Sequence, residues 1–361
     1  MNARTAVVVA GTGRMGRDVG LWCLGRGMDV TWVSRDAGRL DAFRARLARD
    51  LRRLAAGDAP PGEAAFAVAG AGAFARSPDV VLEAVEEDAA AKRALLDALA
   101  ARAGPGALLL STSSSLVPSS LHPRCLGAHF FYPVALTGFV EAIVPAVAAP
   151  DAVVRLRAWL ADLGLAVLAQ DERSAFAVNR LLLPLQNECL RMLADGAAPD
   201  AVEAAAAPVL GTGLLAWMDA VGLDVVAAAV GAYRARMAPD DARDLAALAD
   251  GLAALVAAGK RGRRNGDGLL CGGPLPWPVR DGALPDDATA AWRALWTAGC
   301  RRAIAARELD DAGLQVALSG LFGIQYAAEA DPAGDALAAA WFARTGLSYW
   351  RPGTRGAGQD R

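Results

Sequence analysis

The chain has 361 residues, of which 54% are hydrophobic and 21% are charged. This length exceeds what one hydrophobic core usually supports, so the sequence predicts two or more packed domains and excludes a largely disordered protein. The formal net charge of −2 provides no long-range field to attract nucleic acid or an anionic membrane, so neither is expected as a partner.

The apolar runs of the sequence are all much shorter than the roughly 20 residues that cross a bilayer. The N-terminus enters an apolar run almost at once, without the basic region and cleavage site of a signal peptide, so we expect a cytoplasmic protein. The cysteines are odd in number, scattered and never arranged as C-x-x-C, which favours reduced structural thiols over a metal site or a disulfide frame: Cys23, Cys125, Cys189, Cys271 and Cys300.

From Thr5 to about Gln170, short β-rich runs alternate with helical stretches, which is typical of a mostly parallel sheet with crossover helices. Between the second and third strands, the charged stretch Arg39–Leu54 and the break at Gly57–Gly62 predict a helical excursion from the sheet. The predicted strands are Ala6–Ala10, Val30–Val33, Val80–Glu83, Leu108–Ser111, Ala128–Phe131, Glu141–Val144 and Ala166–Ala169.

After Asn179 the strand pattern ends, and long helical patterns begin with Arg180–Ala194. We therefore expect an α/β domain over residues 1–177, an all-helical domain over 178–280 and an additional helical region over 281–361. Leu183–Asp219 can be aligned with Trp296–Asp331, and duplication and two similar alanine-rich hairpins explain this equally well.

The strongest local motif is Gly11-x-Gly13-x-x-Gly16, which follows the first strand and opens an amphipathic helix. Gly11 permits a tight turn, Gly13 lets a pyrophosphate approach the backbone, and Gly16 lets the helix pack on the strand. This motif predicts a Rossmann-type dinucleotide-binding domain, with Met15 included among the residues of the cofactor turn.

The residue that ends the second strand decides how the adenine ribose is bound. NAD-preferring sites normally have an acid there, whereas this strand ends in Ser34 and Arg35. Both side chains can bind a 2′-phosphate, and Arg39 lies one helical turn further on. The pattern favours NADP(H), while a shift of the strand that brings Asp36 to the ribose would leave NAD(H) as the cofactor.

His129 ends an apolar strand in "GAHFFYP", and Glu141 follows in "FVEAIV". A hydride transfer at a carbinol needs a base for the hydroxyl proton, and an imidazole oriented by a carboxylate supplies one near neutral pH. By spacing alone, a structural histidine is the better interpretation. His122, beside Pro123 in a turn-like stretch, is expected at the surface.

Several separated segments resemble the 3-hydroxyacyl-CoA dehydrogenase family, in that family's order. They are "VVVAGTGRMG", "VVLEAVEEDAAAK", "LLLSTSSSL", "GAHFFYP", "FVEAIV", "AFAVNRLLLP", "MDAVGLD" and "GKRGRRNGDG". The resemblance implies that His129 exchanges the substrate proton, that Glu141 orients it, and that Ser114 and Asn179 hydrogen-bond the reacting oxygen.

Some of these assignments leave alternatives open. The run "STSSS" permits a shift from Ser114 to Ser113 or Ser115, and Asn179 could be only a helix cap. In the helical stretch after the third predicted strand, Glu87 and Lys92 are candidates to line the nicotinamide side of the site, or they lie on an exposed helix face.

The sequence also departs from the family. Tyr132 stands for an asparagine, Ala175 for a glycine, and the segment between Arg35 and Asp79 is shorter than the helical hairpin that helps to grip coenzyme A. The shortened segment favours an acyl group that arrives on another carrier, such as an acyl carrier protein, or as a free acid. Together with Ser34 and Arg35 at the ribose position, it points to a biosynthetic reductase. In the family the helical domain forms the dimer, so a homodimer and a pseudo-dimeric monomer are both expected forms.

The resulting hypothesis is an oxidoreductase that transfers a hydride between NADP(H) and the β-carbon of a 3-hydroxyacyl or 3-oxoacyl thioester of coenzyme A or acyl carrier protein. One alternative is an NAD-dependent dehydrogenase of a free 3-hydroxy acid. The other is a non-catalytic protein that binds a nicotinamide nucleotide.

Overall fold

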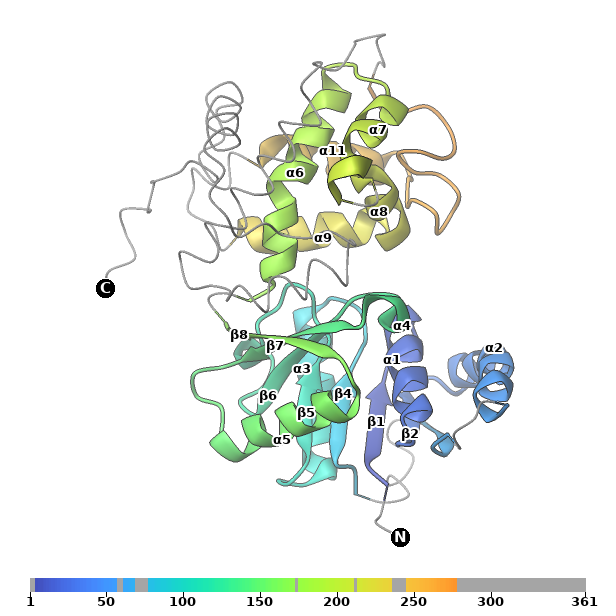
Figure 1. The fold of residues 1–361 in the computed structure, drawn as a ribbon, viewed down its shortest axis with the longest axis vertical. Coiled ribbons are helices and arrows are strands. Elements are labelled where there is room, and N and C mark those ends of the chain that lie inside the picture. The colour runs from blue at the N-terminus through green and yellow to red at the C-terminus, as the bar shows by residue number, and fades with distance from the viewer. Residues whose placement is uncertain are drawn as a thin grey trace. The chain divides into compact units, whose positions relative to one another are not determined.

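The computed structural model describes residues 4–56, 61–68, 77–172, 175–210, 213–235 and 245–277 (Figure 1). The chain divides into two compact units, Met1–Phe176 and Ala177–Arg361. This division falls beside the domain boundary predicted after residue 177. The predicted region 281–361, and with it the second half of the suggested repeat, lies outside the described residues.

The first unit is built on one sheet, whose eight described strands have the order β3-β2-β1-β4-β5-β6-β7-β8. Neighbouring strands are parallel except β6 and β7, which are antiparallel. The mostly parallel sheet with crossover helices confirms the predicted Rossmann-type domain. The strands are β1 Ala6–Ala10, β2 Asp29–Ser34, β3 Ala64–Val68, β4 Val80–Glu83, β5 Leu108–Ser111, β6 Cys125–Phe130, β7 Phe139–Val144 and β8 Ala166–Asp171.

The strand β3 is absent from the sequence-based prediction. The predicted helical excursion is right for α2 (Ala37–Ala55), but the chain then returns and adds β3 to the sheet beside β2. β3 reads AAFAV and is partly exposed at the edge of the sheet. Alanine is depleted in strands, so an alanine-rich edge strand carries little signal in its sequence.

Helices cover both faces of the sheet, as expected when parallel strands are joined by crossovers (Figure 1). Val7 and Val9 of β1 belong to the core shared with α1 (Arg14–Gly25), α2 and α5 (Pro150–Asp162). Val8 and Ala10 point to the other face and pack with α3 (Ala89–Ala103). This alternation follows from the period of two in a strand.

The second unit is helical in its described part, which confirms the predicted helical domain. α11 packs against both α6 and α9. No single described helix is long and apolar enough to cross a membrane, and α8 and α9 meet that test only as a pair bent by 98°. The helices are α6 Ala177–Ala194, α7 Pro199–Leu210, α8 Leu214–Val221, α9 Leu223–Arg234 and α11 Ala246–Ala257.

The described cysteines are free thiols. Cys23, Cys125 and Cys189 are buried, and Cys271 is partly exposed. Burial raises the pKa of the Cys23 thiol to about 12, so this thiol stays protonated and unreactive at neutral pH.

Candidate active site

The glycine turn joins β1 to α1, and its three glycines have different surroundings. A Cβ at Gly11, where φ is +145°, would lie 2.2 Å from the carbonyl oxygen of Ala84, and one at Gly16 would lie 2.4 Å from the Gly11 carbonyl oxygen. Both positions therefore need glycine for packing. A Cβ at Gly13 would meet no described atom within 4 Å, so this position has room for a ligand.

Gly13 is also the N-cap of α1, and the first turn of this helix contains no acidic residue. The N-terminus of a helix presents unpaired backbone N–H groups and a partial positive charge, both of which favour a phosphate. Met15 packs against the core of the sheet and thereby supports the turn. The turn therefore fits the pyrophosphate of a dinucleotide.

At the ribose position, Ser34 is the last residue of β2 and pairs in register with Val68 of β3. The strand shift that would bring Asp36 to this position is absent. Asp36 instead caps α2, because its Oδ1 accepts a hydrogen bond of 3.0 Å from the backbone N–H of Arg39. The side chain of Arg35 is 72% exposed, with its Nη2 3.7 Å from Oε1 of Glu86.

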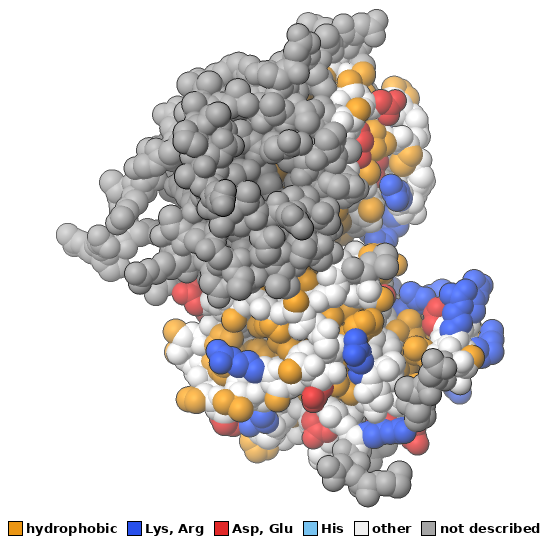
Figure 2. Space-filling view, in the orientation of Figure 1, with side chains coloured by type: hydrophobic (Ala, Val, Ile, Leu, Met, Phe, Trp, Pro, Cys, Tyr) orange, Lys and Arg blue, Asp and Glu red, His pale blue; other side chains and the backbone are white. Residues whose placement is uncertain are grey.

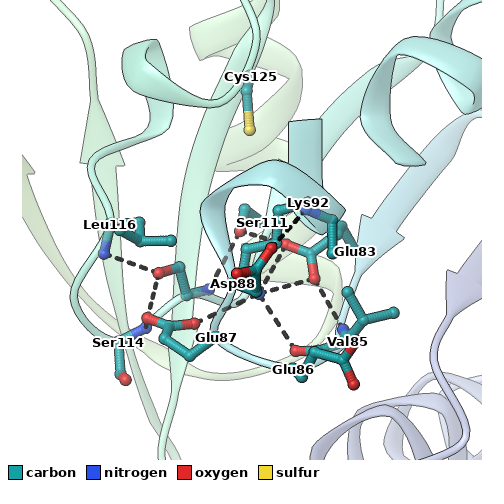
Figure 3. A network of polar contacts seen from close by, with 12 residues as sticks. Glu83, Val85, Glu86, Glu87, Asp88, Lys92, Ser111, Ser114, Leu116 and Cys125 are labelled. Carbon is teal, nitrogen blue, oxygen red and sulfur yellow. Dashed lines mark hydrogen bonds and ion pairs between the residues drawn. The ribbon is translucent and has the colours of Figure 1, made fainter. Parts of the chain in front are cut away.

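Next to the glycine turn, β4 and β5 end in a buried polar network (Figure 3). Glu83, fully buried at the end of β4, accepts bonds of 2.7 and 3.0 Å from Nζ of Lys92 and one of 2.6 Å from Oγ of Ser111. The charges of Glu83 and Lys92 compensate each other at a site where an unpaired charge would be very costly. The sequence-based prediction did not include Glu83 or Ser111 in the site. An acidic residue at the end of an apolar strand, as Glu83 is, could have indicated this network.

Glu87 fixes the serine turn that follows β5. Its Oε1 accepts hydrogen bonds from the hydroxyl of Ser113 at 2.5 Å, the N–H of Ser114 at 3.0 Å, and both the N–H and the hydroxyl of Ser115 at 3.0 and 2.7 Å. Burial alone would raise the pKa of Glu87. The charge of Lys92 and the serine hydroxyls outweigh it and hold that pKa below its ordinary value.

This arrangement bears on two of the open alternatives. Ser113 and Ser115 are buried with their hydroxyls on Glu87, while Ser114 is partly exposed, which favours Ser114 as the serine that meets a substrate. Lys92 is 1% exposed and does not lie on an exposed helix face. Glu87 and Lys92 thus support the serine turn, and their contact with a nicotinamide stays a prediction.

His129 and Glu141 lie directly opposite each other on the antiparallel strands β6 and β7. Nδ1 of His129 is 2.6 Å from Oε2 of Glu141, and the two residues are 5% and 0% exposed. With the Nδ1 proton directed at the carboxylate, Nε2 is the ring nitrogen available to accept a proton. The rings of Phe131 and Phe176 lie 4.5 and 5.6 Å from the imidazole, measured between centroids.

Gln170, near the end of β8, belongs to the same site but is absent from the prediction. Its Nε2 donates a hydrogen bond of 3.1 Å to Oε1 of Glu141, so both carboxylate oxygens have partners. The run AVLAQD has no polar–apolar alternation that would mark Gln170 as buried, and only the pairing of β7 with β8 connects it to Glu141.

Asn179 and His122 are the two remaining positions singled out in the sequence. Asn179 is the third residue of α6 and not its cap, and its Nδ2 donates a hydrogen bond of 3.0 Å to the hydroxyl of Tyr233. Both residues belong to the second unit, so contact between Asn179 and a substrate stays a prediction. His122, which was expected at the surface, lies in a turn with its side chain 14% exposed, and its Nδ1 accepts a hydrogen bond from the N–H of Arg124.

The sheet, the glycine turn and the His129–Glu141 pair define a dinucleotide-binding α/β protein with a buried, hydrogen-bonded histidine–glutamate pair. The model of the NAD binding domain of 3-hydroxyacyl-CoA dehydrogenase matches residues 6–172, and that of the C-terminal domain matches residues 176–271. The chain belongs to the 3-hydroxyacyl-CoA dehydrogenase family.

Among curated proteins, the fatty acid oxidation complex subunit alpha of Shewanella frigidimarina (strain NCIMB 400) is 27% identical over 209 residues, which are 55% of this chain and 28% of that protein. The same subunit of Shewanella sp. (strain ANA-3) is 27% identical over 204 residues, which are 54% of this chain and 28% of that protein. The chain thus spans little more than a quarter of these relatives.

Among solved structures, FadB2 of M. tuberculosis has a TM-score of 0.65 at 27% identity and covers 75% of this chain and 100% of its own. The 3-hydroxybutyryl-CoA dehydrogenase of Escherichia coli K12 has a TM-score of 0.61 at 24% identity and covers 79% of this chain and 61% of its own. At 24% identity, the similarity to the Escherichia coli structure shows a shared fold.

Proposed function

We propose that this protein is an NADP(H)-dependent oxidoreductase that interconverts 3-hydroxyacyl and 3-oxoacyl thioesters, with His129 and Glu141 as its proton-transfer pair. The observation that carries the proposal is the 2.6 Å contact between Nδ1 of His129 and Oε2 of Glu141. It gives the imidazole one defined orientation and a buried counter-charge.

In the oxidation direction, the β-carbon loses a hydride and its hydroxyl loses a proton, so that a ketone forms. A nicotinamide dinucleotide held at the glycine turn would supply the hydride acceptor. Nε2 of His129 takes the proton, and the carboxylate of Glu141 stabilises the imidazolium that results. Reduction reverses these steps: His129 returns the proton to the carbonyl oxygen, whose developing negative charge is stabilised by a hydrogen bond from Ser114.

The cofactor preference rests on the end of β2. Ser34 stands where NAD-preferring sites have an acid, Asp36 is used as the cap of α2, and the side chains of Arg35 and Arg39 are 72% and 77% exposed. A 2′-phosphate at this position would bind the Ser34 hydroxyl and compete with Glu86 and Asp36, which lie 3.7 and 3.9 Å from the guanidinium groups of Arg35 and Arg39.

The positive charge on α2 is the basis for proposing an anionic carrier of the acyl group. This helix bears exposed arginines that gather on one side of the molecule in Figure 2, and a second helix is absent from the described residues between β2 and β4. An anionic carrier, either coenzyme A or an acyl carrier protein, matches this charge. The exposed arginines of the helix are Arg39, Arg44, Arg46, Arg49, Arg52 and Arg53.

The test is a steady-state assay of the purified full chain with NADPH or NADH. The substrates are acetoacetyl-CoA, acetoacetyl-acyl carrier protein and free acetoacetate. Turnover of a thioester with a lower KM for NADPH is expected. Equal use of NADH contradicts the cofactor assignment, and turnover of acetoacetate alone makes the substrate a free acid. Tight NADPH binding without turnover of any of the three makes the protein a non-catalytic nucleotide binder.

A further inference from the structure

Four arginines form an exposed face on the C-terminal half of α2. Phe43 and Leu47 of this helix are buried, so the opposite side points to solvent. Residues three and four positions apart share one side of a helix, which aligns Arg46, Arg49 and Arg53 along the solvent side. Lysine and arginine side chains gather over this helix in Figure 2. The arginine face, as it is called below, consists of Arg46, Arg49, Arg52 and Arg53.

The positive charge of the arginine face is not compensated by acids of the described residues. None of its four side chains forms an ion pair with them. Asp50 lies four positions after Arg46, but its Oδ2 accepts a hydrogen bond of 2.6 Å from Nη2 of Arg17 on α1. The negative end of the helix dipole acts within the last turn, so it accounts for the last two arginines and leaves Arg46 and Arg49 unexplained. Since like charges at this spacing repel, an anionic partner would relieve the repulsion.

The shape and composition of the arginine face indicate what kind of anion it fits. The solvent side of a helix is convex, whereas small ligands bind in concave, mostly apolar pockets. Phe43, the one aromatic residue in the sequence of α2, is 1% exposed and cannot stack on an adenine. Ala42 and Ala45 are exposed and too small to form the wall of a pocket. The face therefore fits the acidic surface of a protein better than it fits the nucleotide of coenzyme A.

Nucleic acid is the other extended anion that could cover a basic helix. Binding of nucleic acid draws on a positive field that extends over the protein surface. The chain as a whole carries a formal net charge of −2, and its local basic patch on α2 is short. The charge distribution therefore favours an acidic protein as the partner.

We propose that the arginine face is the docking surface for an acyl carrier protein, which brings the 3-oxoacyl or 3-hydroxyacyl group to the enzyme as a thioester. The inference rests on the proposed function, because it takes an acyl thioester as the substrate, and it selects one of the two carriers named there. Acyl carrier proteins are small acidic proteins, so their charge complements that of the arginine face.

The test compares the unaltered full chain with the double variant Arg46→Glu/Arg49→Glu. Titration with a bacterial acyl carrier protein measures the dissociation constant, and NADPH-dependent assays measure KM and kcat for acetoacetyl-acyl carrier protein and acetoacetyl-CoA. Reversing two charges at a docking surface should raise the dissociation constant and KM for the carrier protein roughly tenfold or more at low ionic strength. For acetoacetyl-CoA, KM should stay within about twofold, because exposed charges contribute little to a ligand that has no site on this face.

Arg157→Glu is the matched control for a charge reversal, because Arg157 is exposed on another helix, α5, and has no ion pair in the described part of the chain. It should leave the dissociation constant and both KM values unchanged. Arg46→Lys/Arg49→Lys keeps the charge and should keep most of the affinity for the carrier protein. The thermal midpoints of all variants show whether each one folds.

The possible outcomes separate the docking surface from the proposed function. Equal affinity of the unaltered protein and Arg46→Glu/Arg49→Glu for the carrier protein, or an equal rise of both KM values, would overturn the docking surface while turnover of acetoacetyl-CoA keeps the function. Tighter binding of a DNA duplex, lost in the same variant, would assign the face to nucleic acid and also overturn it. Carrier-protein binding that the variant loses, without turnover of any thioester, would support the docking surface and contradict the proposed function.

Discussion

Gln170 and Glu141 are joined by a buried hydrogen bond of 3.1 Å between Nε2 of the glutamine and Oε1 of the carboxylate. The other oxygen of Glu141 binds His129, so the three side chains form a chain across β6, β7 and β8. Glu141 is fully buried, and a buried carboxylate keeps one orientation when both of its oxygens have partners.

Replacing this glutamine tests whether it positions the pair. Gln170→Leu removes the hydrogen bond that Nε2 donates to Oε1 of Glu141, and a hydrogen bond to a charged group is worth about 1.5–3 kcal/mol. We expect kcat to fall roughly tenfold, since about 1.4 kcal/mol corresponds to a factor of ten, with the dissociation constant for NADPH unchanged. The pH profile of kcat should also move, because the electrostatic environment of the imidazole changes. A lower unfolding free energy with an unchanged kcat and pH profile would assign Gln170 a structural role alone.

His129→Gln removes the proposed base. General acid–base groups contribute about 10²- to 10⁴-fold, so kcat should fall by at least about 100-fold while NADPH affinity stays within about twofold. The control is His122→Gln, which alters the other histidine of the chain in a turn outside the pair. Activity and NADPH binding that fall together in His129→Gln would mean that this histidine maintains the fold.

Gly13→Ala separates binding from folding at the glycine turn. A Cβ at this position meets no described atom within 4 Å, so the thermal midpoint should stay unchanged, while dinucleotide affinity should fall at least about tenfold because the methyl group occupies the ligand's space. Gly231→Ala, in α9 and equally uncrowded, should bind normally and gain about 0.5–1 kcal/mol of stability. Unchanged affinity of Gly13→Ala would place the ligand elsewhere.

Ser34→Asp introduces the acid that NAD-preferring sites have at the end of β2. The new carboxylate repels a 2′-phosphate and can accept hydrogen bonds from a ribose hydroxyl, so the ratio of NADPH to NADH affinity should fall by roughly tenfold or more. Parallel fluorescence titrations with both nucleotides measure this ratio. A preference for NADH in the unaltered protein would contradict the assignment of Ser34 and Arg35 before any variant is made.

The lowered pKa of Glu87 predicts a pH dependence of stability. Burial opposes ionisation, but Lys92, Ser113 and Ser115 favour it more, so the folded protein ionises Glu87 more readily than the unfolded chain does. The stabilisation is therefore complete above the ordinary value of 4.5 and is lost as the pH falls through the lowered pKa. Urea unfolding should find Glu87→Gln less stable than the unaltered protein at pH 7, with a difference that shrinks below pH 4.5. A constant difference would contradict the lowered pKa.

The sequence by itself determined the elements with strong local patterns. Apolar β-rich runs marked seven of the eight strands in the described part of the chain, because buried parallel strands are continuously hydrophobic. The glycine turn could be predicted from its local motif, and Gly16 meets its constraint within one strand–turn–helix unit, whereas the close neighbour of Gly11 is Ala84, which follows β4. The strand β3 was not predicted, because an exposed, alanine-rich edge strand lacks the apolar β-rich pattern of the buried strands.

The tertiary structure decided which side chains meet. The pairing of His129 with Glu141 came from family resemblance, since spacing alone favoured a structural histidine, and the antiparallel register of β6 and β7 supplies its physical basis. Gln170 reaches Glu141, and Arg14 reaches Tyr132, from segments far apart in the chain. Contacts of this kind depend on strand order and register. Sequence periodicity leaves both undetermined, because periodicity indicates which face of an element is buried but not which residues pack against that face.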